Sequence, residues 1–239
     1  MKKLFFLLLP LSFLYASSAN NGCNSSIEMG SGYGEIDGFL KVGKDGDRID
    51  LKKDLGLKGY KSSFVSILKA SFKDHKFGLK TNSFKYSGKI KLDKDIIYNS
   101  EKFAKSALAR SRYDLRWAKL SYRYSVNKFV SVGSNLNAIE IKNYINQKSS
   151  KQREFIPSLV INYFIPFNEE LKFITKFSLT PFGKSRYSDF YGGIAFKLGF
   201  KNCSCLNIGY QLNTLHIKNK KFQNDTRYRG VYAGIKVGF

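Results

Sequence analysis

Two histidines are the obvious candidates in this sequence for acid–base chemistry near neutral pH. His75 follows Asp74, and His216 is followed by Ile217 and Lys218. An enzyme that works through a covalent intermediate holds its nucleophile within reach of the base, and the residues after His216 offer none. A histidine alone on a strand is more often structural or exposed. We therefore predict no catalytic residue and no enzymatic activity.

The sequence also lacks the spacings that bind metals or nucleotide cofactors. Its three cysteines and two histidines do not have the spacing of a zinc site. Asp45 and Asp47 flank a glycine in a stretch too short for a calcium-binding EF-hand loop. No strand-to-helix turn follows Gly30, Gly32 and Gly34, so they form no dinucleotide motif, and we expect them to permit close packing of the first strand. No metal or cofactor is predicted.

The composition excludes disorder and does not favour nucleic-acid binding. Aromatic residues make up 15% of the chain, whereas disordered chains are poor in them. The net charge is +23, from 41 Lys and Arg against 18 Asp and Glu. A nucleic-acid surface gathers its positive charge on one face or module, but here lysines alternate with apolar residues along nearly the whole chain. No nucleic-acid partner is expected.

The first nineteen residues have the pattern of a secretory signal peptide. Lys2 and Lys3 precede an apolar run from Leu4 to Ala16, and small residues suited to cleavage follow up to Ala19. The run is shorter than the roughly 20 residues that cross a bilayer as a helix. An uncleaved anchor is one alternative, and a lipoprotein attached through Cys23 is another.

Most of the remaining sequence alternates between apolar and polar residues with a period of two, which indicates β-strands. Runs between polar breaks predict ten strands, at about residues 32–43, 60–72, 77–90, 110–126, 129–143, 153–167, 171–183, 188–200, 205–219 and 227–239. In chain order, tight turns alternate with mostly longer loops at 44–59, 91–109, 144–152, 184–187 and 220–226. The connection 184–187 is no longer than the tight turns and counts as a loop only by its place in the order.

Turns and loops that alternate are typical of a transmembrane up-and-down antiparallel β-barrel. A closed barrel leaves no unpaired strand edge in lipid. We therefore predict an all-β fold of about ten strands, with eight as the alternative. The expected divisions are a signal peptide at 1–19, a periplasmic N-terminal segment at 20–31 and the barrel at 32–239. A secreted β-sandwich is the other all-β possibility, because alternation alone does not distinguish lipid from core.

The last strand resembles the C-terminal assembly signal of Gram-negative outer-membrane β-barrel proteins. The residues that carry the resemblance are Tyr232, Ile235, Val237 and the terminal Phe239. Residues 49–57 also resemble a loop motif of small, uncharacterised outer-membrane barrels. The resemblance implies a monomer in the cell outer membrane, in contact with lipid and lipopolysaccharide, and recognition by the barrel-assembly machinery during biogenesis.

Ten strands are also the number in the omptin proteases, which use carboxylates and an Asp–His pair near the extracellular rim. Asp93 and Asp95, in the second long loop, match the two acidic residues. His216, however, follows Thr214 and Leu215 instead of an acid at the required spacing. A rim-located hydrolase of this type is therefore the third of our functional hypotheses.

If the apolar face points to lipid, the opposite face lines the lumen. The expected lumen-lining residues are Glu35, Asp37, Lys119, Arg123, Lys172, Lys176, Lys197 and Lys236. Small barrels are filled by side chains, and open channels appear at roughly 16 to 18 strands. A structural or surface-interaction protein is thus the first hypothesis, and a small anion-permeable channel lined by lysines is the second.

The three cysteines allow one disulfide in an exported, oxidising compartment. Cys203 and Cys205 are unfavourable partners, because residues i and i+2 of a strand lie about 6.6 Å apart. Cys23 precedes the first strand and lies near the turn before Cys205. We expect Cys23 to pair with Cys203 or Cys205, and three free thiols are the alternative.

Overall fold

The computed structural model describes residues 24–199 and 204–239. The signal peptide expected at 1–19 therefore lies outside the described residues. The strands are β1 Ser25–Val42, β2 Ile49–Asp50, β3 Lys61–Phe72, β4 His75–Lys91, β5 Ile96–Tyr98, β6 Glu101–Phe103, β7 Leu108–Ser125, β8 Val130–Ile145, β9 Lys148–Pro166, β10 Leu171–Leu179, β11 Arg186–Lys197, β12 Cys205–Lys218 and β13 Phe222–Gly238.

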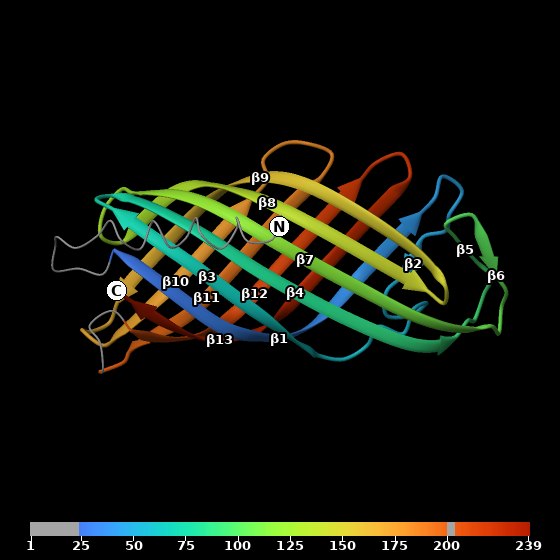
Figure 1. The fold of residues 1–239 in the computed structure, drawn as a ribbon, viewed down its shortest axis with the longest axis horizontal. Coiled ribbons are helices and arrows are strands. Elements are labelled where there is room, and N and C mark those ends of the chain that lie inside the picture. Colours follow the sequence, from blue (N-terminus) through green and yellow to red (C-terminus); the bar gives the residue numbers. More distant parts are fainter. Residues whose placement is uncertain (1–23, 200–203) are drawn as a thin grey trace, which may run out of the picture.

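Ten long strands form one closed antiparallel barrel (Figure 1). Each of them pairs with the next along the chain, and β1 closes the barrel by pairing with β13 from Ser26 opposite Gly238 to Val42 opposite Phe222. The predicted all-β fold and the ten strands are confirmed. Short β2 adds to the end of β1, while β5 and β6 form a separate hairpin. Among the described residues, none forms a helix long and apolar enough to cross a membrane.

The two ends of the barrel differ. We call the end where β1 begins and β13 finishes the terminal end, on the left in Figure 1, and the opposite one the loop end. Tight turns such as Lys73–Asp74 lie at the terminal end, and the long connections 43–60 and 92–107 lie at the loop end. The loop predicted at 144–152 is wrong, because β8 and β9 extend until only residues 146 and 147 separate them.

The first strand begins earlier than predicted. β1 starts at Ser25, so residues 25–31 belong to the barrel wall and not to a periplasmic segment. The error arose because small residues weaken the alternation there. Gly30 and Gly34 face inward, where an added Cβ would lie 2.6 Å from the Tyr232 hydroxyl and 2.7 Å from the Tyr228 ring. These glycines are needed because two tyrosines cross the lumen against β1.

The outer wall is apolar only over its terminal half. On β9, for example, Phe155, Leu159, Ile161, Tyr163 and Ile165 are exposed, and the outward residues nearer the loop end are basic. From Phe155 to Ile165 the strand covers roughly 33 Å, which gives a height of about 25 Å at a tilt of about 40°. This is about the height of the apolar band of outer-membrane barrels.

The interior reverses this pattern. Towards the loop end the lumen is filled by buried apolar and aromatic side chains, whereas towards the terminal end it is polar and charged. The barrel is therefore built like a membrane protein over its terminal half and like a water-soluble β-barrel over its loop half. Strands longer than the roughly 9 to 11 residues needed to cross a bilayer accommodate both halves.

The connection 43–60 completes the wall and the core at the loop end. β3 begins opposite Gly34, so β1 beyond that point has no β3 partner. There β2 pairs with β1, and the Ser111 hydroxyl donates to the Leu55 carbonyl. Leu51, Leu55 and Leu57 are buried in the core cluster together with aromatic residues of β4 and β7. Residues 49–57 thus take the place of β3 and close the lumen at the loop end.

Candidate functional site

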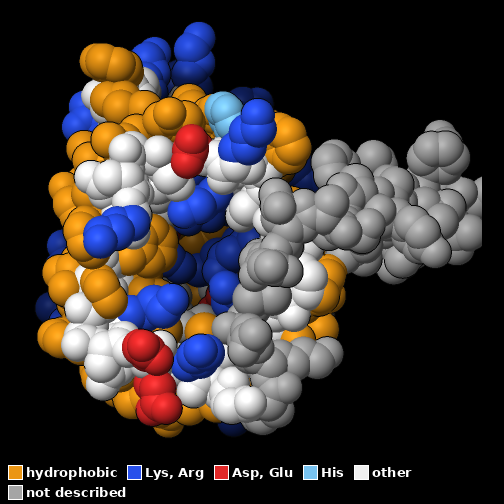
Figure 2. All heavy atoms as spheres, turned by 90° about the vertical axis from the view of Figure 1, so that its left-hand side faces the viewer, with side chains coloured by type: hydrophobic (Ala, Val, Ile, Leu, Met, Phe, Trp, Pro, Cys, Tyr) orange, Lys and Arg blue, Asp and Glu red, His pale blue; other side chains and the backbone are white. Residues whose placement is uncertain are grey.

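A cavity of about 260 Å³ occupies the terminal half of the lumen. Viewed from the terminal end, basic side chains surround its opening, and apolar side chains cover much of the outside of the barrel (Figure 2). The described basic residues that line it are Lys69, Lys76, Lys80, Lys119, Arg123, Lys172, Lys176 and Lys236. Only two described carboxylates, those of Glu28 and Asp189, line the same cavity. The lining is therefore strongly positive.

Glu28 is fully engaged by its neighbours. Lys69 Nζ lies 2.8 Å from one carboxylate oxygen, while the Asn207 amide and the Tyr232 hydroxyl each donate to the other over 2.9 Å. These donors come from β3, β12 and β13. The carboxylate thus joins strands on both sides of the barrel closure, which explains why a buried acid is tolerated at this position.

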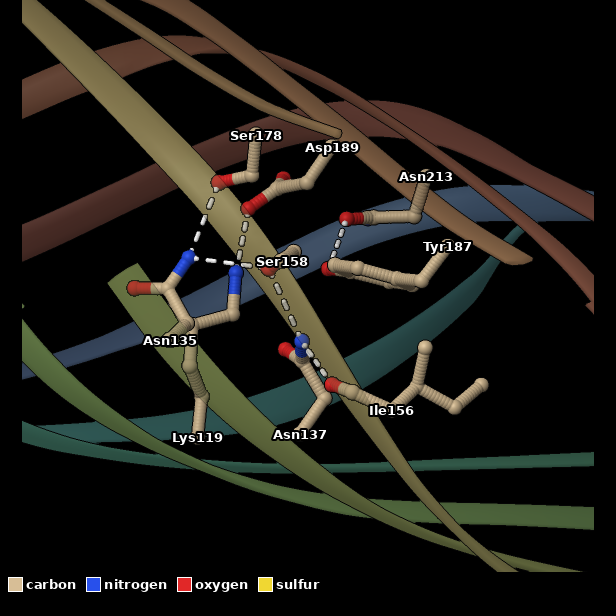
Figure 3. A network of polar contacts seen from close by, with 9 residues as sticks. All are labelled: Lys119, Asn135, Asn137, Ile156, Ser158, Ser178, Tyr187, Asp189 and Asn213. Atoms are coloured by element: carbon tan, nitrogen blue, oxygen red, sulfur yellow. Dashed lines mark hydrogen bonds and ion pairs between the residues drawn. The ribbon is translucent and has the colours of Figure 1, made fainter. Parts of the chain in front are cut away.

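Asp189 forms the second ion pair, across the lumen. Its carboxylate accepts a hydrogen bond from Lys119 Nζ over 2.5 Å (Figure 3). Lys119 lies on β7 and Asp189 on β11, four strands apart in the order of the sheet. Both side chains are mostly buried, with 9% and 13% of their surface exposed. The pair therefore acts as a strap between two walls of the barrel.

A layer of amides and hydroxyls lies beside this strap (Figure 3). The Asn135 amide donates to the hydroxyls of Ser158 and Ser178 over 3.2 Å, and the Asn137 amide donates to Ser158 over 3.1 Å. Tyr187 donates to Asn213 over 3.1 Å. These residues separate the charged cavity from the apolar core.

An aromatic layer closes the lumen towards the loop end. The ring of Trp117 lies 5.5 Å from that of Tyr187 and 5.9 Å from that of Phe84, and Phe84 lies 4.2 Å from Tyr228. Aromatic rings at such separations pack against one another in cores. Side chains therefore fill the lumen between the cavity and the loop end, as the size scaling of small barrels predicts.

The structure places the predicted lumen-lining residues in three groups. Lys119, Arg123, Lys172, Lys176 and Lys236 line the cavity. Lys197 is exposed at the terminal end of β11 and stands opposite the inward-facing Cys205. The third group, Glu35 and Asp37, does not line the lumen.

Glu35 and Asp37 face outward, and the prediction is wrong for both. Ile36 between them is buried in the core, and Glu35 forms ion pairs with Lys52, over 2.8 Å, and Arg229 on the outside of the wall. Because the surroundings of the wall change from apolar to polar along β1, the polar face of the strand turns from inward to outward. The sequence prediction assumed one facing throughout.

Sequence reasoning missed Glu28 and Asp189, the two acids that do line the lumen. Glu28 was assigned to a segment before the barrel. Asp189 lies on β11 two positions from the inward-facing Tyr191, so strict alternation along that strand would have placed it inside.

The residues of the expected assembly signal lie at the closing seam. Tyr232 faces inward, Ile235 is exposed on the outer wall, and Val237 is half-buried. Phe239 exchanges two backbone hydrogen bonds with Ser25, over 2.9 and 3.1 Å. The terminal residue is thus the last link between the final strand and the first.

The candidate hydrolase residues, which the sequence predicts at the rim, have separate partners at the loop end. His216 lies on the outer wall near the loop end, with Nδ1 3.4 Å from the Asp225 carboxylate. Asp95 instead pairs with Lys102 over 2.7 Å in the β5–β6 hairpin, and Asp93 is exposed in the same loop. In the parts of the chain that the structure describes, no group of three or more metal-binding side chains occurs.

Cys205 is buried, lines the cavity and forms no disulfide with another described residue. Cys23 and Cys203 lie outside the described residues, so the expected disulfide stays a prediction.

The outer wall carries a basic belt around the loop half of β4, β7, β8 and β9. Its outward-facing residues are Lys85, Lys89, Lys91, Arg110, Arg112, Arg116, Lys142, Lys151 and Arg153. Asp114 and Glu140 are the acids among them, and Glu140 pairs with Arg153 over 2.7 Å and with Lys151 over 3.1 Å. The belt follows directly on the apolar band.

A groove of about 530 Å³ crosses the boundary between the band and the belt. Phe64, Phe155 and the small residue Ala118 line the groove. Its charged lining residues are Arg116, Arg153, Glu140 and Glu154. The groove therefore combines an apolar channel with a charged end of two arginines and two glutamates, where Arg153 is paired with Glu140.

The chain is thus a closed ten-stranded antiparallel β-barrel with an apolar band outside. Its fold is that of outer-membrane barrels. The outer-membrane protease OmpT from Escherichia coli has a similar structure, with a TM-score of 0.54 and 10% sequence identity over 93% of this chain and 100% of that chain. At this identity the likeness concerns the fold and not the activity.

Two further solved structures are similar to this chain at lower scores. Neisserial surface protein A has a TM-score of 0.39 and 12% identity, over 90% of this chain and 97% of that chain. The attachment invasion locus protein Ail of Yersinia pestis has a TM-score of 0.35 and 13% identity, over 90% of this chain and 99% of that chain. No protein-family model matches the sequence, and no curated protein matches it.

Proposed function

We propose that this protein is a monomeric outer-membrane barrel with a structural or surface-interaction role, and not an open channel. The observation that carries the proposal is the filled loop half of the lumen, where 49–57 packs Leu51, Leu55 and Leu57 against the aromatic layer. Ions that entered the cavity from the terminal end would meet this core before they reached the loop end.

The outer band supports a location in the outer membrane. Its height of about 25 Å matches the hydrocarbon thickness that such barrels span, and the closed sheet leaves no strand edge in lipid. The signal peptide expected at 1–19 would export the chain. The barrel-assembly machinery would then recognise the last strand, which ends at Phe239.

The groove and the basic belt support a role at the membrane surface. Lipopolysaccharide and anionic phospholipids combine acyl chains with phosphate groups. Beside Ala118 the groove has room for an acyl chain. Arg116, which forms no ion pair among the described residues, lies where a phosphate would follow, and Arg153 beside it is paired with Glu140. Arginine binds phosphate with two parallel hydrogen bonds. We therefore propose that anionic lipid of the outer leaflet contacts the groove, and that the loop half of the barrel projects beyond the membrane.

An anion-permeable channel is the second candidate, because the cavity is positive. It requires residues 49–57 or the aromatic layer to move aside, since the structure holds them in a packed core. The refolded protein in planar bilayers tests the choice. We expect no regular current steps. Reproducible anion-selective steps from protein that heat-modifiable gel mobility shows to be folded would contradict the proposed role.

Lipid contact is tested separately with lipopolysaccharide in zwitterionic micelles. The double variant Arg116→Gln/Arg153→Gln should bind it more weakly. The matched control Lys218→Gln/Arg227→Gln also removes two charges, from exposed positions near the loop end, and should bind as the parent does. Equal binding by all three proteins would argue against the groove.

A further inference from the structure

The cavity in the terminal half of the lumen carries positive charge that the described residues do not neutralise. Lys69 is paired with Glu28, and Lys119 with Asp189. For six other basic residues of the cavity, no described carboxylate lies within 4 Å: Lys76, Lys80, Arg123, Lys172, Lys176 and Lys236. A charge removed from bulk water is costly unless a partner compensates it.

Like charges also face one another directly across neighbouring strands. Lys76 on β4 is opposite Arg123 on β7, and Lys80 is opposite Lys119 two inward positions further along. Side chains in such positions have Cβ atoms about 4.5 to 5.5 Å apart, and like charges there destabilise a sheet. Asp189 is engaged by Lys119, so this stretch of wall has more positive charge than its own acids offset.

The remaining local partners are weak or already occupied. The Glu28 carboxylate accepts three hydrogen bonds, as described above. Lys176 Nζ lies 5.0 Å from the ring centre of Tyr191, and Lys76 Nζ lies 5.5 Å from that of Phe164, so each faces a ring and not an anion. Arg123 Nε is buried without a hydrogen-bond partner among the described residues. A donor is thus left free at the cavity wall.

The surroundings strengthen the attraction for an anion. The cavity lies at the height of the outer apolar band, so lipid surrounds this part of the barrel in the proposed location. Attraction between charges rises as the dielectric constant of the medium falls. The cavity opens at the terminal end (Figure 2), and the amide and aromatic layers close it on the other side. A ligand would therefore enter from the terminal end.

We propose that this cavity binds a small, multivalent oxyanion of the phosphate class, held by Lys80, Arg123 and Lys176. The volume of about 260 Å³ is below the roughly 300 to 1,000 Å³ of pockets for drug-sized ligands, which favours a compact anion. A guanidinium group matches two phosphate oxygens, and ammonium groups add charge from any direction. This site does not depend on whether the barrel conducts.

Calorimetry with the refolded, full-length protein in zwitterionic detergent tests the proposal. Pyrophosphate is the probe, with inorganic phosphate as the weaker comparison. The Lys80→Gln/Lys176→Gln variant and the Arg123→Gln variant should each bind pyrophosphate at least about tenfold more weakly. The control Lys218→Gln/Arg227→Gln removes the same charge as the lysine pair from exposed positions on the outer wall and should leave the dissociation constant within about twofold.

Three results would overturn the site. These are an absence of pyrophosphate binding by the parent protein, equal weakening by the lumen and outer-wall variants, and competition by vesicles that contain phosphatidic acid. The last would assign the phosphate to a lipid headgroup on the outer wall. Heat-modifiable gel mobility verifies that each variant is folded. Lys172→Gln removes only one charge and should weaken pyrophosphate binding less. It replaces the double variant in the test if that variant does not fold.

Discussion

Replacement of Asp189 by asparagine tests whether the strap across the lumen stabilises the barrel. The carboxylate lies 2.5 Å from Lys119 Nζ, and the two side chains are only 13% and 9% exposed. Removal of one partner from a buried ion pair typically costs about 3 to 5 kcal/mol, because the other charge is left uncompensated. Lys80 stands opposite Lys119 and adds repulsion, while water that enters the cavity reduces the cost. We expect a loss of about 3 kcal/mol.

Urea unfolding of the refolded protein, followed by gel mobility and tryptophan fluorescence, measures this loss. Asp225→Asn is the matched control, because it removes the same charge from the exposed pair with His216 and should cost less than about 1 kcal/mol. The apolar double variant Lys119→Met/Asp189→Leu should recover most of the stability. If Asp189→Asn costs no more than the control, the strap does not stabilise the barrel.

Three further changes have distinct expected outcomes. Deletion of Phe239 should prevent assembly while export continues, and normal outer-membrane levels of the shortened chain would contradict this. Leu55→Ala should cost about 2 to 5 kcal/mol in urea unfolding, because the leucine is 2% exposed in the core; an unchanged midpoint would refute the packing of 49–57. Gly34→Val should lower the yield of heat-modifiable protein, since its Cβ would lie 2.7 Å from the Tyr228 ring.

The number of strands and their order follow from the sequence alone. A period of two persists along each of the ten segments, and breaks of polar residues separate them, so pattern and length together predict the barrel. The residues at which strands begin and end are harder to predict from the sequence. β1 begins seven residues before the predicted start at 32, because inward glycines such as Gly30 carry no side chain that could show the alternation.

The facing of each strand was only partly predictable. Along β13 the outward residues change from Arg227 and Arg229 to Val231 and Ile235, which is a change from charged to apolar side chains on one unbroken face. A sequence pattern reports contrast between two faces but not which face is inside. For this reason the same reasoning that assigned Lys172 and Lys176 to the lumen misassigned Glu35.

The candidate site shows the same division. Alternation and charge, read from the sequence, place several lysines on the lumen face. The number of acidic side chains that pair with these lysines depends on which strands lie across the barrel from one another. Lys119 and Asp189 are separated by seventy residues, and only the closure of β1 on β13 brings β7 and β11 to opposite sides of one cavity.

The strands, their order and the alternation of their faces are thus readable from the amino-acid pattern, because they depend on local geometry and on the period of a pleated chain. Only the folded barrel shows where the alternation reverses, which acids pair across the lumen, and that residues 49–57 replace β3 in the wall. Those features depend on contacts between distant segments and on the medium outside each level of the barrel, and a local pattern contains neither.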